Sequence, residues 1–75
     1  MITYEYDKLM GARIRAIRES AKMTQEELSA KLQVLGCDIT RSALAKIEVG
    51  QRHIYSFEIK CISEALSVKF EELFP

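Results

Sequence analysis

Apolar residues recur at helical spacing in the segment 24–35, beside a polar face. Its apolar stripe consists of Leu28, Leu32 and Leu35, at i, i+4 and i+7. Thr24 and Glu27 have the spacing of a capping box, in which each side chain accepts a hydrogen bond from the other residue's backbone N–H. Gly36 releases the backbone and Asp38 favours a turn. The pattern therefore predicts a helix that begins after Thr24 and ends before Gly36, with a loop over 36–39.

A second, shorter helix is predicted over 41–49, with Thr40 as its N-cap and Gly50 just after its end. On a helical wheel of about 100° per residue, its residues divide into two halves. The outer half carries Arg41, Ser42, Ala45, Lys46 and Val49, and the inner half carries Ala43, Leu44, Ile47 and Glu48. An outer face with two cations and small residues fits the major groove of B-DNA, although an ordinary solvated face can have the same composition.

Three further helices are predicted around this pair. The first begins near Asp7, the fourth is capped by Ser56, and a short last helix follows a break at 67–68 and ends at Pro75. Their apolar stripes are Met10, Ile14, Ile17 and Ala21; Ile59, Ile62 and Leu66; and Phe70, Leu73 and Phe74. We assign these residues and Ile54 to the core, and a dimer face remains the alternative for the aromatic residues. The prediction is an all-α fold of five helices in a single domain over 1–75.

Residues 1–6 have a different pattern, since Ile2, Tyr4 and Tyr6 alternate with polar residues at the period of a strand. Six residues cannot form a sheet alone. We therefore predict an extended N-terminal arm that lays its apolar side on the bundle. A dimer contact and a DNA-contacting arm are the alternatives.

The composition limits the classes of function. The chain has 75 residues, of which 48% are apolar, enough for one small core and too few for a separate catalytic or ligand-binding domain. It has neither an apolar run of the roughly 18 residues that span a membrane nor the pattern of a signal peptide. We therefore expect a cytoplasmic protein with no membrane partner and no small-molecule ligand.

No arrangement of residues predicts catalysis, a cofactor or a metal site. The chain lacks a nucleophile motif and a phosphate-binding glycine loop, and its two cysteines, Cys37 and Cys61, do not have metal-ligand spacing. We expect both cysteines to be reduced thiols. Cys61 falls in a helix and is assigned to packing, whereas Cys37 falls in a loop, where a redox sensor is an alternative.

Three strings, TQEELSAKL, TRSALAKIEVGQR and EALSVKFEELF, follow the Arg-rich segment ARIRAIRE in that order. Together they resemble the lambda-repressor-like (Cro-type) helix-turn-helix family over about residues 9–74. The resemblance implies a compact five-helix DNA-binding domain whose third helix enters the major groove. The base-reading residues would be Arg41, Ser42, Ala45 and Lys46. The residues that would contact DNA phosphates are Gln25, Thr40, Gln51 and Arg52.

The resemblance also implies a structural ion pair between Arg18 and Glu48. The helical wheel supports it independently, because Glu48 falls on the inner half, where a carboxylate needs a partner. The chain departs from the family between its second and third helices. The family usually joins the positions of Leu32 and Ile39 by about one residue, whereas this chain has residues 33–38 there. We interpret the insertion as a longer second helix and loop.

The charges are balanced but unevenly distributed. The chain holds 11 Lys and Arg against 11 Asp and Glu; residues 1–53 hold nine against seven, and residues 54–75 hold two against four. This polarity would orient the molecule on a polyanion, with modest affinity. We therefore predict a sequence-specific regulator that binds double-stranded DNA as a homodimer. The alternative is a helix-turn-helix module, such as an antitoxin or adaptor, that binds a protein partner.

Overall fold

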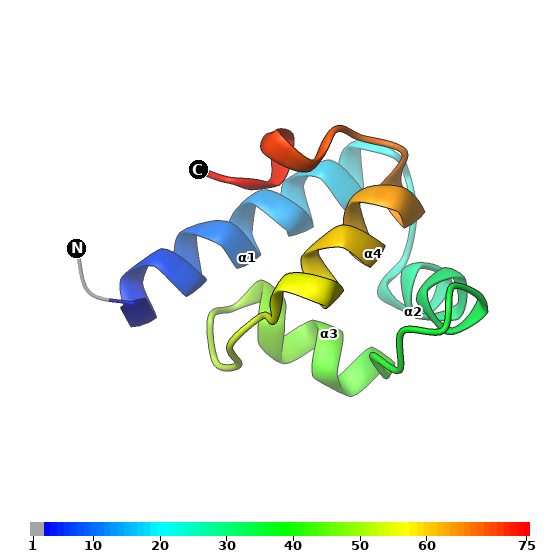
Figure 1. Ribbon diagram of the computed structural model, residues 1–75, viewed down its shortest axis with the longest axis horizontal. Coiled ribbons are helices and arrows are strands. Elements are labelled where there is room, and N and C mark those ends of the chain that lie inside the picture. Colours follow the sequence, from blue (N-terminus) through cyan, green and yellow to red (C-terminus); the bar gives the residue numbers. More distant parts are fainter. Residues whose placement is uncertain (1–2) are drawn as a thin grey trace.

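The computed structural model describes residues 3–75, with side chains from Glu5 onward. Its elements are the α-helices α1 (Thr3–Ser20), α2 (Gln25–Val34), α3 (Arg41–Glu48) and α4 (Ser56–Leu66), and the 3-10 helix η1 (Phe70–Leu73). Figure 1 shows α1 running along one side of the molecule, α2 and α3 on the other side, and α4 between them. The all-α prediction is confirmed, but the count of five α-helices is wrong because the last element is a single 3-10 turn.

The first helix begins at Thr3, four residues before the predicted start. The extended arm predicted for residues 1–6 is therefore wrong for residues 3–6, which form the first turn of α1, and residues 1–2 lie outside the described residues. Tyr6 precedes Met10 and Ile14 by four and eight residues, so the apolar stripe of the helix extends upstream of Asp7. The alternation that suggested a strand was too short to outweigh that stripe.

The helix ends in the middle of the chain follow the predicted capping. The Thr24 hydroxyl accepts from the Glu27 N–H at 3.0 Å, and the Glu27 carboxylate accepts from the Thr24 N–H at 2.8 Å. The Thr40 hydroxyl accepts from the N–H of Ala43 at 3.1 Å. The exception is α4, whose N-cap is Tyr55 rather than Ser56. Its start lies one residue earlier because the Glu58 carboxylate accepts from the Tyr55 N–H at 3.0 Å.

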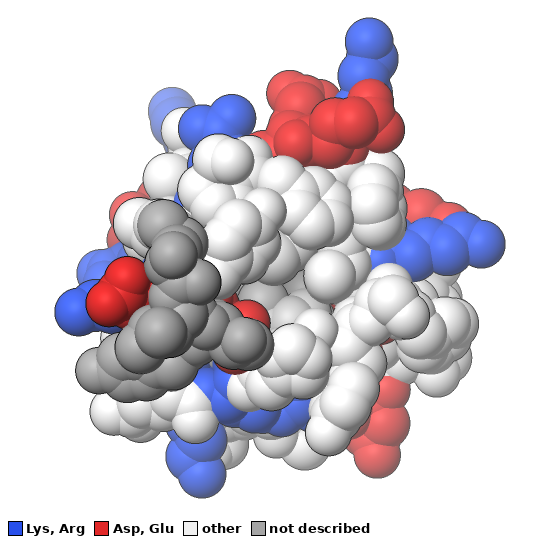
Figure 2. All heavy atoms as spheres, turned by 60° about the vertical axis from the view of Figure 1, so that its left-hand side comes forward, with Lys and Arg blue, Asp and Glu red and all other residues white. Residues whose placement is uncertain are grey.

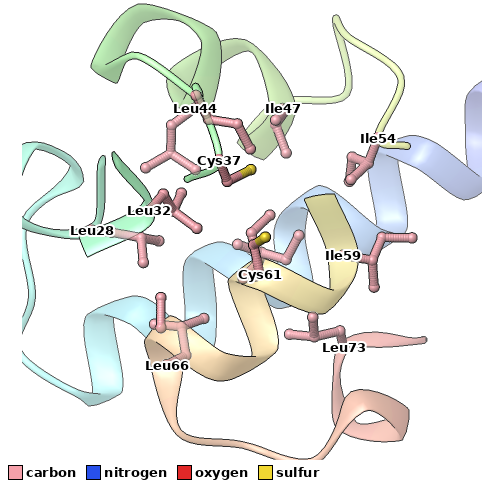
Figure 3. Close-up of a cluster of buried hydrophobic side chains, with 14 of the residues drawn as sticks. Leu28, Leu32, Cys37, Leu44, Ile47, Ile54, Ile59, Cys61, Leu66 and Leu73 are labelled. Atoms are coloured by element: carbon pink, nitrogen blue, oxygen red, sulfur yellow. The ribbon is translucent and has the colours of Figure 1, made fainter. Parts of the chain in front are cut away.

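The core is formed where α1, α2, α3 and α4 converge (Figure 3). The fully buried side chains are Ile14, Leu28, Leu32, Ile39, Leu44, Ile47, Ile62 and Leu73. Ile54, predicted as a core residue, is 4% exposed. Two assigned core residues are wrong: Ala21 follows the end of α1 and is exposed, and Phe70 is 42% exposed. Leu35, the last residue of the predicted apolar stripe after Thr24, is the C-cap of α2 and is 41% exposed. A single turn at the edge of the bundle buries Leu73 and cannot also cover Phe70.

The position of α3 depends on a close approach to α1. A Cβ atom at Gly11 of α1 would collide with the carbonyl oxygen of Ile47 in α3. Glycine at this point lets the backbone of α1 approach the backbone at the end of α3, which fixes the position of α3 on the bundle. None of the helices in residues 3–75 has the length and apolar content needed to cross a membrane.

Candidate nucleic-acid interface

The outer face of α3 carries the residues that the sequence predicted to read bases. Arg41, Ser42 and Lys46 are exposed, and Ala45 is half-buried. Within the described residues, neither Arg41 nor Lys46 forms an ion pair or a side-chain hydrogen bond. Val49, the C-cap of α3, is 48% exposed and adds an apolar group at the end of the helix. This face therefore combines two free cations with small side chains.

The inner face of α3 is held to the bundle through Glu48. Arg18 Nε lies 2.7 Å from Glu48 Oε2, and Arg18 Nη2 lies 3.0 Å from Glu48 Oε1, so the pair is bidentate. The two side chains are 9% and 1% exposed. The hydrogen bond to Glu48 raises the pKa of the Arg18 guanidinium above its ordinary value. The structure thus brings together the two residues expected to pair, one from α1 and one from α3.

Two further contacts extend this pair to α2. Arg18 Nη1 donates to the carbonyl oxygen of Met23 at 2.8 Å, just before α2 begins. Gln25 Nε2 donates to Glu48 Oε1 at 3.0 Å. Gln25, predicted to contact a phosphate, therefore already uses one amide donor within the protein. The network of Arg18, Gln25 and Glu48 links the start of α2 and the end of α3 to α1, and it helps to set the angle between α2 and α3.

A polar depression lies between the starts of α2 and α3. Its lining residues are Arg15, Arg18, Thr24, Gln25, Glu26 and Arg41. Thr24, Gln25 and Glu26 place the start of α2 at this depression. The first amides of a helix have no acceptor within it, which makes a helix N-terminus suited to an anion, although here the Glu27 amide already donates to the Thr24 hydroxyl. Arg15 was not singled out from the sequence, because its side chain is one of several on the exposed faces of α1. Its partner in the structure is Glu19, at 3.3 Å.

The other predicted phosphate contacts lie at the two ends of α3. Thr40 precedes the helix and is exposed. Gln51 follows it and is exposed, and its backbone N–H is fixed to the Lys46 carbonyl at 2.9 Å. Gly50 has φ of +78°, so the chain turns sharply between α3 and this loop. These two residues therefore flank the helix that carries the candidate base-reading side chains.

Arg52 is not a free cation. Its Nη1 and Nη2 donate to the two carboxylate oxygens of Glu58 at 2.9 and 2.8 Å, and Nη1 also donates to the His53 carbonyl at 3.0 Å. The hydrogen bond to Arg52 lowers the pKa of the Glu58 carboxyl, and the same bond raises the pKa of Arg52. Spacing along the chain does not indicate this pair, because residues 52 and 58 belong to a loop and to the next helix. The ion pair makes Arg52 a weaker candidate for phosphate binding than Thr40 or Gln51.

A second surface, which we call the aromatic face, lies beyond the end of α3. It is formed by Tyr6, His53, Tyr55, Phe70 and Phe74. Beside them lies a shallow hollow, where Asp7 Oδ2 is 3.1 Å from His53 Nδ1. The hollow is lined by Tyr6, Asp7, Met10, His53, Ile54, Ile59 and Phe74. Tyr55 is 63% exposed, and Phe70 packs against Phe74 with ring centroids 5.2 Å apart. Figure 2 shows a side of the molecule on which a broad area consists of uncharged residues, with most of the Lys, Arg, Asp and Glu residues toward its edge.

The comparisons with known proteins agree with this geometry. A family profile described as helix-turn-helix matches residues 14–73. Among solved structures, the chain is similar to the restriction-modification controller protein C.AhdI from Aeromonas hydrophila, with 28% identity and a TM-score of 0.87 over 99% of this chain and 100% of that one. A search of curated proteins found no match.

Two further solved structures are DNA-binding domains. The S. venezulae BldD DNA-binding domain has 25% identity and a TM-score of 0.80, over 95% of this chain and 99% of that one. A second BldD DNA-binding domain has 24% identity and a TM-score of 0.83, over 99% of this chain and 100% of that one, and shows the fold alone. The resemblance inferred from the sequence is confirmed, and the chain belongs to the Cro/C1-type helix-turn-helix family.

Proposed function

We propose that this protein is a transcriptional regulator that binds double-stranded DNA sequence-specifically, reads the major groove with α3 and acts as a homodimer. The observation that carries the proposal is the contrast between the two faces of α3. The outer face presents Arg41 and Lys46 without protein partners, while the inner face is fixed by the buried Arg18–Glu48 pair. Membership of the helix-turn-helix family supports a DNA-binding regulator.

In this proposal, α3 reads bases through four side chains. Arg41 and Lys46 donate to guanine O6 and N7, Ser42 forms a hydrogen bond to a base edge, and Ala45 packs near a thymine methyl group. The exposed Val49 would add a second apolar contact at the end of the helix. The helix is rigidly placed, because Gly11 and the Arg18–Glu48 pair hold it on α1 from the opposite side. That rigidity favours selection of one sequence over another.

Phosphate contacts would position the domain without reading sequence. One phosphate would lie in the polar depression, where Gln25, the first amides of α2 and Arg15 can donate. The Thr40 hydroxyl and the Gln51 amide would hold the DNA backbone at the two ends of α3. Arg52 would contribute less than the sequence suggested, since Glu58 already neutralises it.

The aromatic face is the surface that would form the homodimer. It carries exposed aromatic side chains, which are enriched at protein interfaces, and the carboxylate in its hollow, Asp7, is already paired with His53. The loop after α3 leads directly into it, since His53 and Tyr55 belong to both. A two-fold contact there would hold two copies of α3 on a common side, as reading two inverted half-sites requires.

The alternative is a module that binds a protein partner through the same face of α3. Such an interface would need exposed apolar side chains, and Val49 is the large one that this face presents within the described residues. The other strongly exposed apolar side chains, such as Val34 and Phe57, lie on α2 and α4. The outer face of α3 therefore favours DNA over a partner helix.

Selection of the purified protein against a random double-stranded DNA library, at two salt concentrations, tests the proposal. We expect an enriched motif with two inverted half-sites about one helical turn apart. Absence of enrichment, with weak binding that disappears at moderate salt, would refute sequence-specific reading and favour the partner-binding module.

The dimer has a separate test in sedimentation equilibrium. Tyr55→Ser should weaken self-association, because it removes the most exposed aromatic ring of the aromatic face. Val34→Ser is the matched control, since Val34 is 87% exposed and lies on α2, away from that face. If the two variants weaken association equally, or if the wild-type protein is monomeric, the aromatic face is not a dimer interface.

A further inference from the structure

The two cysteines, far apart in the sequence, lie together in the core. Cys37 belongs to the segment between α2 and α3, Cys61 belongs to α4, and they are 2% and 4% exposed. Figure 3 shows both sulfur atoms in the middle of the cluster of buried side chains. The two thiols are near enough for Cys61 to raise the pKa of the Cys37 thiol. The sequence alone gave no reason to pair them, and DNA binding uses neither.

Cys37 lies in the segment that leads into α3, so a displacement of its backbone would move the start of α3. The segment 35–40, which we call the α2–α3 connection, is held by the Cys37 N–H to the Leu32 carbonyl at 2.9 Å and by Ser29 Oγ to the Ile39 carbonyl at 2.7 Å. It ends at Thr40, whose hydroxyl caps α3. Cys61, by contrast, lies in the middle of α4, where the helical ladder holds the backbone. Of the two, the connection is the part that can move.

We propose that Cys37 and Cys61 are a redox-active dithiol pair, whose oxidation to an intramolecular disulfide displaces the α2–α3 connection and weakens DNA binding. The second half of the proposal rests on the DNA-binding function proposed above. The oxidant is a small-molecule disulfide of the glutathione class.

The reaction balances as two thiol–disulfide exchanges. A cysteine thiolate attacks the small disulfide, forms a mixed disulfide and releases one small thiolate. The second cysteine thiolate then attacks the protein sulfur of the mixed disulfide, forms the Cys37–Cys61 bond and releases the second small thiolate. The two protons lost by the cysteines end on the two released thiols. The protein is oxidised by two electrons and the small disulfide is reduced.

Burial controls the rate of this reaction. Desolvation, followed by the neighbouring Cys61, raises the pKa of the Cys37 thiol to about 12. Since the thiolate is the nucleophile, the closed protein reacts slowly at neutral pH. Reaction requires a transient opening of the α2–α3 connection, and we expect it to be faster for free protein than for protein whose α3 is held by DNA.

Bond formation requires a displacement. Two thiols that are not bonded to each other are separated by more than the length of a disulfide bond, which is about 2.05 Å. The core is close-packed, so the contraction must be taken up by a backbone shift. The α2–α3 connection takes most of it and carries Thr40 and the start of α3 with it. Arg41 follows directly after Thr40, so its alignment with a base edge changes.

The test compares reduced protein with protein treated with oxidised glutathione. We expect an intact mass about 2 Da lower and no free thiol after denaturation. We also expect unchanged helical circular dichroism, and an affinity for the selected DNA lower by about fivefold or more, the loss that goes with one misaligned base contact. Dithiothreitol should restore both mass and affinity. Cys61→Ala and Cys37→Ala are the matched controls; each can form only a mixed disulfide and should show no 2 Da loss.

The outcomes separate the two halves of the proposal. An unchanged mass, or a disulfide between two protein molecules, overturns the dithiol pair, and this readout needs neither DNA nor the alanine variants. An intramolecular disulfide with equal DNA affinity, or with loss of the helical signal, overturns the local displacement. If reduced protein selects no DNA motif, the proposed function fails together with the DNA half, while mass still decides whether the dithiol pair exists.

Discussion

The buried pair between Arg18 and Glu48 is the contact whose removal should matter most for stability. Glu48→Ala leaves the Arg18 guanidinium, with 9% of its side chain exposed, without its two charge-assisted hydrogen bonds. It also removes the acceptor of the Gln25 amide. Breaking a buried ion pair costs about 3–5 kcal/mol. A chain of this length has a free energy of unfolding of about 4–11 kcal/mol, so the variant should be marginally folded at 25 °C.

Urea denaturation followed by circular dichroism measures this loss. Arg15→Ala is the matched control, because Arg15 also forms an ion pair with a carboxylate, Glu19, but both side chains are 55% exposed. An exposed pair contributes about 0–1 kcal/mol. The double replacement Arg18→Met with Glu48→Met should recover at least half of the loss, since it leaves no buried charge unpaired. If Glu48→Ala and Arg15→Ala lose the same stability, the reasoning from burial is refuted.

Three other predictions use the same structure. Arg41→Ala should cost about 1–3 kcal/mol of binding free energy and relax specificity at one base pair without lowering stability, whereas Arg52→Ala should lower stability because it leaves Glu58 unpaired. Repeating the library selection and the urea titration on both variants separates these effects. Equal, sequence-independent binding losses would contradict the assignment of Arg41. Gly11→Ala should lose about 1–3 kcal/mol despite the higher helix propensity of alanine, because its methyl group would collide with the Ile47 carbonyl; a raised melting temperature would show that α1 and α3 can separate freely. Arg52 lowers the folded-state pKa of Glu58, so the stability that the carboxylate contributes is present above its unfolded pKa and is lost as pH falls through the lower folded pKa. The stability difference between wild type and Glu58→Gln should therefore shrink as pH is lowered from about 5 to about 3. A difference that is independent of pH would exclude the ion pair as its source.

The sequence predicted the motif well because local rules determine it. The capping box at Thr24 and Glu27, the cap at Thr40 and the glycine after α3 depend on spacing within a few residues, and the structure has all of them. The Arg18–Glu48 pair joins residues 30 apart. It came from the resemblance together with the inward position of Glu48 on its helix. A local pattern can show that a carboxylate is buried, but it cannot show which cation reaches it.

The ends of the chain were predicted less well, and for a physical reason. Residues 3–6 alternate like a strand, yet they continue a helical stripe that becomes visible only when Tyr6 is aligned with Met10. At the other end, Phe70 has the spacing of a core residue, but whether it is buried depends on how much of the bundle reaches that edge. The proximity of Cys37 and Cys61 likewise depends on the packing of α4 against the α2–α3 connection, which no short-range pattern reports.

The ion pairs determine which cations the fold leaves without a protein partner. Arg18 and Arg52 add to the count of positive charges in the sequence. In the fold, however, Arg18 is neutralised by Glu48 and Arg52 by Glu58. The cations left for DNA are those without such partners, above all Arg41 and Lys46 on α3. Neutral donors, such as the Thr40 hydroxyl and the Gln51 amide, release no counterions when they bind phosphates. Affinity would then come mainly from base contacts and from dimerisation, and a shallow salt dependence follows from the internal pairing that holds α3 in place.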